Sequence, residues 1–198
     1  MKVIVGIGNY GKRYVGTRHN VGFDVVDEVG RRHDGRINKR RFLSLTGTVQ
    51  VGNEQVVLVK PRTYVNETGQ AVRQVLDWFK LSADALLVVC DDVHLELGCG
   101  RARRSGSSGG HKGLKSVAAR LGTEEFARLR LGIGAPECDE VSRVDYVLGR
   151  FTASDRRRID EVIVQAAEAV DVWVHQGIEA CMNGFNSIGR EDSSGACY

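Results

Sequence analysis

One histidine in this chain stands among polar side chains, just ahead of the first predicted helix. His19 lies within "TRHN", residues 17–20, and Asn9 and Tyr14 precede it in the same glycine-rich segment. A side chain with a pKa near 6.5 is the natural base for removing a proton from water at neutral pH. A lone histidine is more often structural, so it is this polar setting that favours general-base chemistry.

A general base of this kind needs a carboxylate that fixes its tautomer and stabilises the imidazolium. Asp91 can supply one, because it follows an apolar run at 86–90 that is typical of a central strand. Active sites of α/β sheets gather at the carboxyl ends of strands, and Asn9 follows the first predicted strand at that edge. Asn66 either caps the helix after it or points its amide into the same cleft. The alternative for Asp91 and Asp92 is a strand-end turn with solvated carboxylates.

Strands that alternate with helices must position these residues. The predicted strands are 3–7, 43–51, 56–60, 86–90, 129–133 and a short basic one at 100–104, and the predicted helices are 21–32, 68–79, 114–121 and 156–175. A Gly52-Asn53 turn makes a hairpin and hence a mixed sheet, and Asn20 is expected to cap the first helix. We therefore expect a single three-layer α/β/α domain with a twisted mixed β-sheet over residues 1–186, followed by a flexible tail at 187–198.

Composition excludes several classes of protein. A chain of 198 residues that is 42% hydrophobic can bury one sizeable core, so one domain is expected. Met1 leads directly into a predicted strand, and no run approaches the roughly 18 apolar residues of a membrane span. Five cysteines without a C-x-x-C pair are typical of reduced thiols in the cytoplasm. Cys90 and His94 have a metal-like spacing but no second pair, so neither a metal nor a cofactor is expected.

Two glycine motifs suggest other chemistry. Residues 6–11 match a dinucleotide-binding turn, but that turn needs a helix that begins inside it and a second strand, for which 30–41 is too polar. Residues 106–110 match G-x-S-x-G, the signature of a serine nucleophile. A nucleophilic Ser108 would need a buried apolar strand before it, whereas the charged segment 101–104 precedes it. A flexible loop is the prediction there.

Basic residues surround this loop and the start of the next predicted helix. Backbone N–H groups and the helix dipole favour phosphates at such a place. Positive charge clustered beside it favours a nucleic-acid backbone, whereas a charge run taken alone is as often a solvated face. The cluster comprises Arg101, Arg103, Arg104, Lys112, Lys115, Arg128 and Arg130.

Several stretches together resemble the bacterial peptidyl-tRNA hydrolase family. They are "VGIGNYG", "YVGTRHNVGFDVVD", "KPRTYVNETGQAV", "VVCDDVHLELG", "SGGHKGLKSV" and "FARLRLGIG", in the family's order, and the resemblance extends roughly over residues 1–186. It implies a monomeric enzyme that needs no metal or cofactor. The implied reaction is hydrolysis of the ester that joins a peptide to the tRNA 3′ ribose, which releases the tRNA for reuse.

The resemblance also implies a role for each candidate residue in catalysis. His19 would activate water against the ester, and Asp91 would orient His19 and support its basic form. Asn9 would sense the first amide of the peptide and so select N-blocked over free aminoacyl esters. Asn66 would form a hydrogen bond with the substrate.

The implied contacts with tRNA come from other side chains. Tyr14 and Tyr64 would contact the 3′ end, and Arg103 and Arg130 would clamp the 5′ phosphate. Lys112 stands at a substrate-binding position where the family usually has asparagine.

Two further departures from the family pattern are Tyr10, in place of proline, and Val65, in place of methionine. Two rival functions stay open at this point. One is a relative without catalytic activity that only binds RNA, against which the presence of the four implied active-site residues argues. The other is a serine esterase that uses Ser108.

Overall fold

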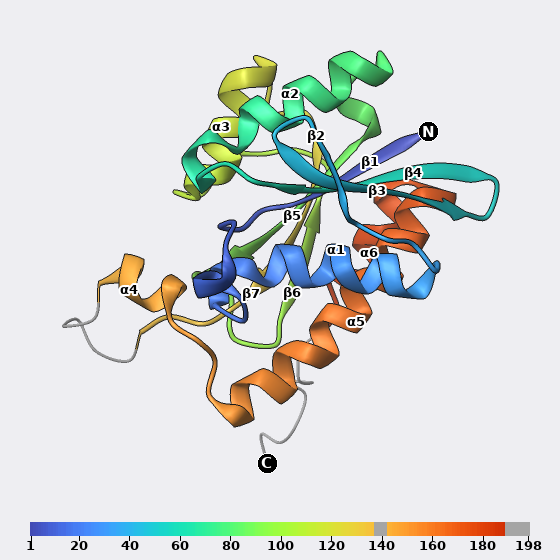
Figure 1. Cartoon of the computed structure of the whole chain (residues 1–198). Coiled ribbons are helices and arrows are strands. Elements are labelled where there is room, and N and C mark those ends of the chain that lie inside the picture. The colour runs from blue at the N-terminus through green and yellow to red at the C-terminus, as the bar shows by residue number, and fades with distance from the viewer. Residues whose placement is uncertain (137–141, 189–198) are drawn as a thin grey trace.

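A seven-stranded mixed β-sheet runs through the centre of the molecule (Figure 1). The computed structural model describes residues 1–136 and 142–188. The strands lie in the order β2-β3-β4-β1-β5-β7-β6, in which β4, β1, β5 and β7 are parallel to one another. Their bounds are β1 (Lys2–Gly6), β2 (Lys39–Arg41), β3 (Ser44–Val51), β4 (Glu54–Pro61), β5 (Leu86–Asp92), β6 (Gly100–Arg103) and β7 (Ala127–Gly132).

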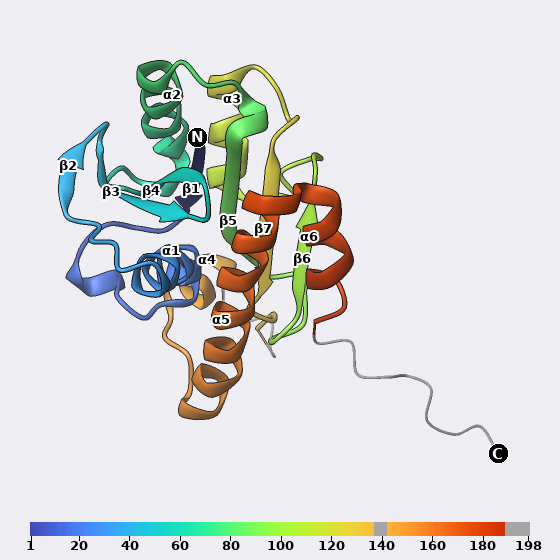
Figure 2. The same cartoon turned by 90° about the vertical axis from the view of Figure 1, so that its right-hand side faces the viewer.

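Helices cover both faces of the sheet, which gives the three layers visible in Figure 2. One face carries α1 (Val21–Arg32), α5 (Ala153–Gln176) and α6 (Ile178–Phe185), and the other carries α2 (Thr68–Phe79) and α3 (Lys112–Leu121). The short helix α4 (Arg143–Leu148) packs beside the 3-10 turn η2 (Arg18–Asn20), which precedes α1. The predicted three-layer α/β fold with a mixed sheet is confirmed.

The central strand β5 shows why the sheet forms where it does. All seven of its residues are buried, and alternate side chains enter the apolar clusters on the two faces. Burying each large aliphatic side chain stabilises the fold by about 1.5–3 kcal/mol. The strand ends on two buried carboxylates, Asp91 and Asp92, which are 2% and 8% exposed. Polar groups buried at this point need partners, and the site described below supplies them.

Among the described residues, one strand and two α-helices were not predicted. Strand β2 consists of three exposed basic residues at the edge of the sheet, where charge is tolerated and blocks pairing with other chains. Because this strand contains no apolar residue, a search for apolar runs does not find it. Helices α4 and α6 are only six and eight residues long, too short for a clear helical period.

Most of the predicted C-terminal tail, residues 189–198, lies outside the described residues. Ile188, inside its predicted start, packs against the core beside α6. Within the described part of the chain, no helix is both long and apolar enough to cross a membrane.

Candidate active site

A pocket at the carboxyl ends of β1 and β5 gathers most of the predicted site residues. Its volume is about 400 Å³. The predicted residues that line it are Asn9, His19, Tyr64, Asn66, Asp91, Lys112 and Arg130. Tyr14 and Arg103 lie outside its lining, on the 3-10 turn η1 (Lys12–Tyr14) and on β6. The sheet edge thus brings together side chains that are far apart in the sequence.

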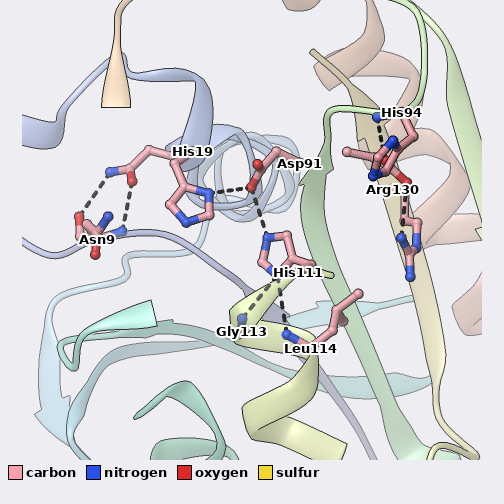
Figure 3. Close-up of polar contacts among 10 residues, drawn as sticks. Asn9, His19, Asp91, His94, His111, Gly113, Leu114 and Arg130 are labelled. Atoms are coloured by element: carbon pink, nitrogen blue, oxygen red, sulfur yellow. Dashed lines mark hydrogen bonds and ion pairs between the residues drawn. The ribbon is translucent and has the colours of Figure 1, made fainter. Parts of the chain in front are cut away.

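His19 and Asp91 form a hydrogen-bonded pair in this pocket (Figure 3). His19 Nδ1 lies 2.7 Å from Asp91 Oδ1, and the two side chains are 14% and 3% exposed. Because a carboxylate only accepts hydrogen bonds, Nδ1 of the neutral imidazole carries the proton and Nε2 keeps its lone pair. Among the described residues, Nε2 has no hydrogen-bond partner. The pair therefore presents a free basic nitrogen at the pocket.

A second histidine, which the sequence analysis did not single out, shares the carboxylate. His111 Nε2 lies 3.1 Å from the same Asp91 oxygen, and its Nδ1 accepts the backbone N–H groups of Gly113 and Leu114 at 3.1 and 3.3 Å (Figure 3). Since Nδ1 accepts, the proton must reside on Nε2, which donates to Asp91. His111 thus caps α3 and connects that helix to the carboxylate. Its place three residues before the predicted helix 114–121 gave no clear signal, because α3 begins two residues earlier than predicted, at Lys112.

Burial and neighbouring charge act in opposite directions on this pair. Burial lowers the pKa of His19, but attraction and hydrogen bonding to Asp91 outweigh it, so the net pKa is raised above 6.5, and the Lys112 charge acts against this rise. Burial by itself would raise the pKa of Asp91, yet the two imidazoles hold it well below its usual range. Asp91 therefore stays ionised and stabilises a proton on His19.

Asn20 fixes the loop that carries Asn9. The prediction that Asn20 caps α1 is wrong, because its side chain makes no capping hydrogen bond. Instead its Oδ1 accepts the Asn9 N–H at 2.8 Å, and its Nδ2 donates to the Asn9 carbonyl at 3.0 Å. A Cβ atom at Gly8 would lie 2.9 Å from Asn20 Oδ1, so a glycine is needed beside this clamp. Asn20 thus holds both the backbone N–H and the carbonyl of Asn9, a residue that lines the pocket.

Close packing also requires glycine where α1 meets β1, because a Cβ atom at Gly6, the first glycine of the motif, would collide with the Gly22 carbonyl oxygen of that helix. A Cβ atom at Gly22 would lie 2.5 Å from the Val89 carbonyl oxygen and 2.6 Å from that of Ile7. Helix α1 therefore approaches β1 and β5 closely, which places η2 and His19 at the sheet edge. Because α1 begins at Val21, well outside the glycine turn, the dinucleotide interpretation is excluded, as the sequence analysis predicted.

The segment after β4 supplies another wall of the pocket. It contains the 3-10 turn η3 (Val65–Glu67), and α2 begins without a side-chain cap, so Asn66 does not cap that helix. Of its two predicted alternatives, Asn66 lines the pocket. Tyr64 lines it too and is 66% exposed, whereas Val65 is 6% exposed.

Four arginines share one face of the sheet at the β6–β7 edge. Cross-strand register pairs Arg101 with Arg130 and Arg103 with Arg128. The prediction that Arg128 adds to the basic surface is wrong. It is 1% exposed and donates to three backbone carbonyls, those of Gly106, Glu124 and Phe126. Arg101 and Arg103 are exposed.

Arg130 is largely buried and occupied by protein partners. Its guanidinium lies 3.0 Å from Asp92 Oδ2 and 2.7 Å from the Ser107 carbonyl oxygen, and 12% of its side chain is exposed. Asp92 in turn accepts the His94 N–H at 2.9 Å (Figure 3). Asp92 thus anchors the 106–110 loop through Arg130, while Asp91 accepts the hydrogen bond from His19.

Helix α4 forms the far wall of the pocket and is fastened to the residue next to His19. The Arg18 N–H donates to the Gly149 carbonyl at 2.9 Å, and its guanidinium lies 4.3 Å from the centre of the Tyr146 ring. Val144 and Val147 of this helix line the pocket. The helix therefore adds apolar surface to the pocket, together with the charged Arg143.

Ser108 lacks the partner that a nucleophile requires. Within the described part of the chain, no hydrogen bond joins its hydroxyl to an imidazole, and both ring nitrogens of His111 are engaged elsewhere. Residues 106–110 form a loop, as predicted.

His19, Asp91 and His111 place possible metal-ligand atoms within 4.8 Å of one another. In the observed arrangement one carboxylate oxygen accepts both imidazole N–H groups, so protons connect the three side chains.

This fold and site define a class of α/β enzymes in which an aspartate-oriented histidine faces an open pocket at the strand ends. The family model described as peptidyl-tRNA hydrolase matches residues 3–194. The peptidyl-tRNA hydrolase of Syntrophomonas wolfei is 44% identical over 94% of this chain and 100% of its own length, and that of Ligilactobacillus salivarius is 43% identical with the same coverage. The crystal structure of peptidyl-tRNA hydrolase from Acinetobacter baumannii superposes with a TM-score of 0.89 at 30% identity over 95% of both chains. The chain belongs to the peptidyl-tRNA hydrolase family.

Proposed function

We propose that this chain hydrolyses the ester between a peptide and the tRNA 3′ end, with His19 as the general base that activates water. The observation that carries the proposal is the buried 2.7 Å contact between His19 and Asp91, which leaves His19 Nε2 available at the pocket. Membership of the family supports the substrate class.

The reaction needs one proton to move twice. His19 Nε2 takes a proton from water, and the water oxygen attacks the ester carbonyl carbon while Asp91 stabilises the imidazolium. Collapse of the tetrahedral intermediate breaks the bond to the ribose 3′ oxygen, which receives the proton from His19. The products are a free peptide acid and a tRNA with a free 3′ hydroxyl. The amides of Asn9 and Asn66 would hold the first peptide amide and the ester in place.

The rival functions are separated by one assay. Wild-type protein should release N-acetylamino acid from N-acetylaminoacyl-tRNA, and Ser108→Ala should do so at the wild-type rate, with EDTA present throughout. Binding of tRNA without release would support the inactive RNA-binding relative. Loss of release in Ser108→Ala would support the serine esterase.

The protein would act as a cytoplasmic monomer without a metal or cofactor.

The exposed face of the β6–β7 edge would contact the tRNA backbone. Arg103→Ala should weaken tRNA binding and lower the slope of log K against log salt by about one unit or less, because one phosphate contact is lost. Arg157→Ala is the matched control, since Arg157 is an exposed arginine on α5, on the opposite face of the sheet. Fluorescence anisotropy at several salt concentrations measures both variants. Equal slopes for Arg103→Ala and wild type would place the tRNA elsewhere.

Arg130 would contribute in a different manner. Its partners Asp92 and the Ser107 carbonyl indicate that it shapes the 106–110 loop and offers only part of its charge to the tRNA. Arg130→Ala should therefore weaken tRNA binding as well. On a small N-blocked ester that lacks the tRNA body, Arg103→Ala should have the wild-type rate, whereas Arg130→Ala should be somewhat slower.

The charge of Lys112 should be visible in the pH dependence. His19 must be neutral to act, so activity is lost as the pH falls through its pKa. Lys112 lowers that pKa, and Lys112→Asn should therefore move the acidic limb of the pH–rate profile to higher pH. A minimal N-blocked ester at fixed ionic strength is the substrate, and Lys115→Asn, one turn along α3 and outside the pocket lining, is the control. Coincident limbs, with a change only in tRNA binding, would mean that Lys112 serves the tRNA backbone alone.

A further inference from the structure

Two loops on the rim of the pocket are joined by a stacked pair of side chains that the reaction itself does not use. The Arg62 guanidinium lies over the Tyr10 ring, 4.5 Å from its centre. Tyr10 follows Asn9, and Arg62 stands two residues before Tyr64; Asn9 and Tyr64 both line the pocket. The pair therefore spans the rim between the segment after β1 and the segment after β4.

The backbone is held by separate hydrogen bonds at Arg62 and next to Tyr10. Asn20 bonds both the N–H and the carbonyl of Asn9, the residue before Tyr10, and the Arg62 N–H donates to the Leu43 carbonyl oxygen at 2.7 Å. The loops therefore do not need the stacked contact to keep their positions. Even so, 42% of Tyr10 remains exposed, and Arg62 is exposed as well. An aromatic ring and a guanidinium thus remain on a fixed rim, accessible from outside.

We propose that Tyr10 and Arg62 form a stacking subsite for an unpaired nucleobase at the 3′ end of the tRNA. This inference rests on the proposed function, because hydrolysis at the 3′ ribose must bring the terminal nucleotides to the rim of the pocket. Aromatic rings and arginine planes are the surfaces on which proteins stack single-stranded bases, and Arg62 also offers a charge to the adjoining phosphate. Proline, which the family usually has at position 10, cannot supply this ring, so the subsite distinguishes this chain from that pattern.

The test compares Tyr10→Ala, Tyr10→Phe and Tyr10→Pro with wild type. The substrates are N-acetylaminoacyl-tRNA and a series in which each unpaired 3′ nucleotide in turn lacks its base. On the intact tRNA, Tyr10→Ala and Tyr10→Pro lose the stacking contact with one base, which should raise KM about 5- to 100-fold and leave kcat unchanged. Tyr10→Phe keeps the aromatic ring, so its KM should lie within about twofold of wild type. On one of the abasic substrates, all four proteins should have the same KM.

Trp78→Ala is the matched control. Trp78 is 59% exposed and has the Arg41 guanidinium 4.7 Å from its ring centre, but it lies on α2 and does not line the pocket. Its KM should equal that of wild type on every substrate. This comparison separates a general loss of an arginine–aromatic pair from a loss at the rim.

Three results would overturn the inference. They are an unchanged KM in Tyr10→Ala, a loss that persists on every abasic substrate, and a fall in kcat at constant KM, which would make Tyr10 a brace for Asn9. Anisotropy of the same tRNAs bound to the same variants gives an independent readout. If wild type hydrolysed no ester, the proposed function would fail, and the abasic series would still decide by affinity whether Tyr10 stacks on a base.

Discussion

His19→Ala is expected to lower kcat for peptidyl-tRNA by about 10²–10⁴-fold, the usual contribution of a positioned general base. The free Nε2 at the pocket is the nitrogen that the variant removes, and Asp91 keeps its second partner, His111. Affinity for tRNA and thermal stability should therefore change little. Single-turnover release of N-acetylamino acid measures the chemical step, and anisotropy measures binding.

His33→Ala is the matched control for this experiment. His33 Nε2 lies 2.8 Å from Asp171 Oδ1, so it is another histidine–aspartate pair, but it joins α1 to α5 away from the pocket. Its rate should equal that of wild type. A His19→Ala protein that kept more than about a tenth of the wild-type rate would contradict a general-base role, given the size of that effect in enzymes.

Asp91→Asn is expected to reduce kcat strongly, by about 10²-fold, though less completely than His19→Ala. An asparagine amide carries no charge to stabilise the imidazolium. If its NH₂ group faces the imidazole, His19 must place its proton on Nε2, which removes the lone pair from the pocket. The base is still present in this variant, but it is misoriented and poorly supported.

The pH profile of Asp91→Asn supplies a second readout with a definite sign. Asp91 raises the pKa of His19, so without the carboxylate His19 stays neutral to lower pH. The acidic limb should move to lower pH even as the plateau falls. Asp92→Asn is the comparison, because that carboxylate bonds Arg130 and His94 and should leave the limb where it is. Full activity of Asp91→Asn across neutral pH would exclude a catalytic role for the contact between Asp91 and His19.

Much of the fold was accessible from the sequence because its signals are local. The apolar run at 86–90 predicted a central strand, and the 3.6-residue period after Asn20 predicted α1, and both are observed. The rule that sites lie at the carboxyl ends of parallel strands then brought His19, Asp91 and Asn9 to one edge. Strand β2 escaped prediction because an exposed edge strand needs no apolar side chains.

The pairing of side chains was decided only by the tertiary structure. Asn20 could cap a helix or bind another segment, and the close approach of α1 to β1 directs its amide to Asn9. The sequence predicts that Arg128 adds charge to the surface. In the structure the loops beside β7 bury it, and backbone carbonyl groups such as that of Glu124 accept its hydrogen bonds.

For the hydrogen-bonded pair of His19 and Asp91, the sequence by itself determined which residue types stand at the sheet edge. It did not determine that His111 would share the Asp91 oxygen with His19, because that contact joins the N-terminus of α3 to the end of β5. Local patterns set the face and the end of an element on which a side chain lies. Hydrogen bonds between elements depend on strand order, register and close helix packing, which exist only once the whole domain has formed.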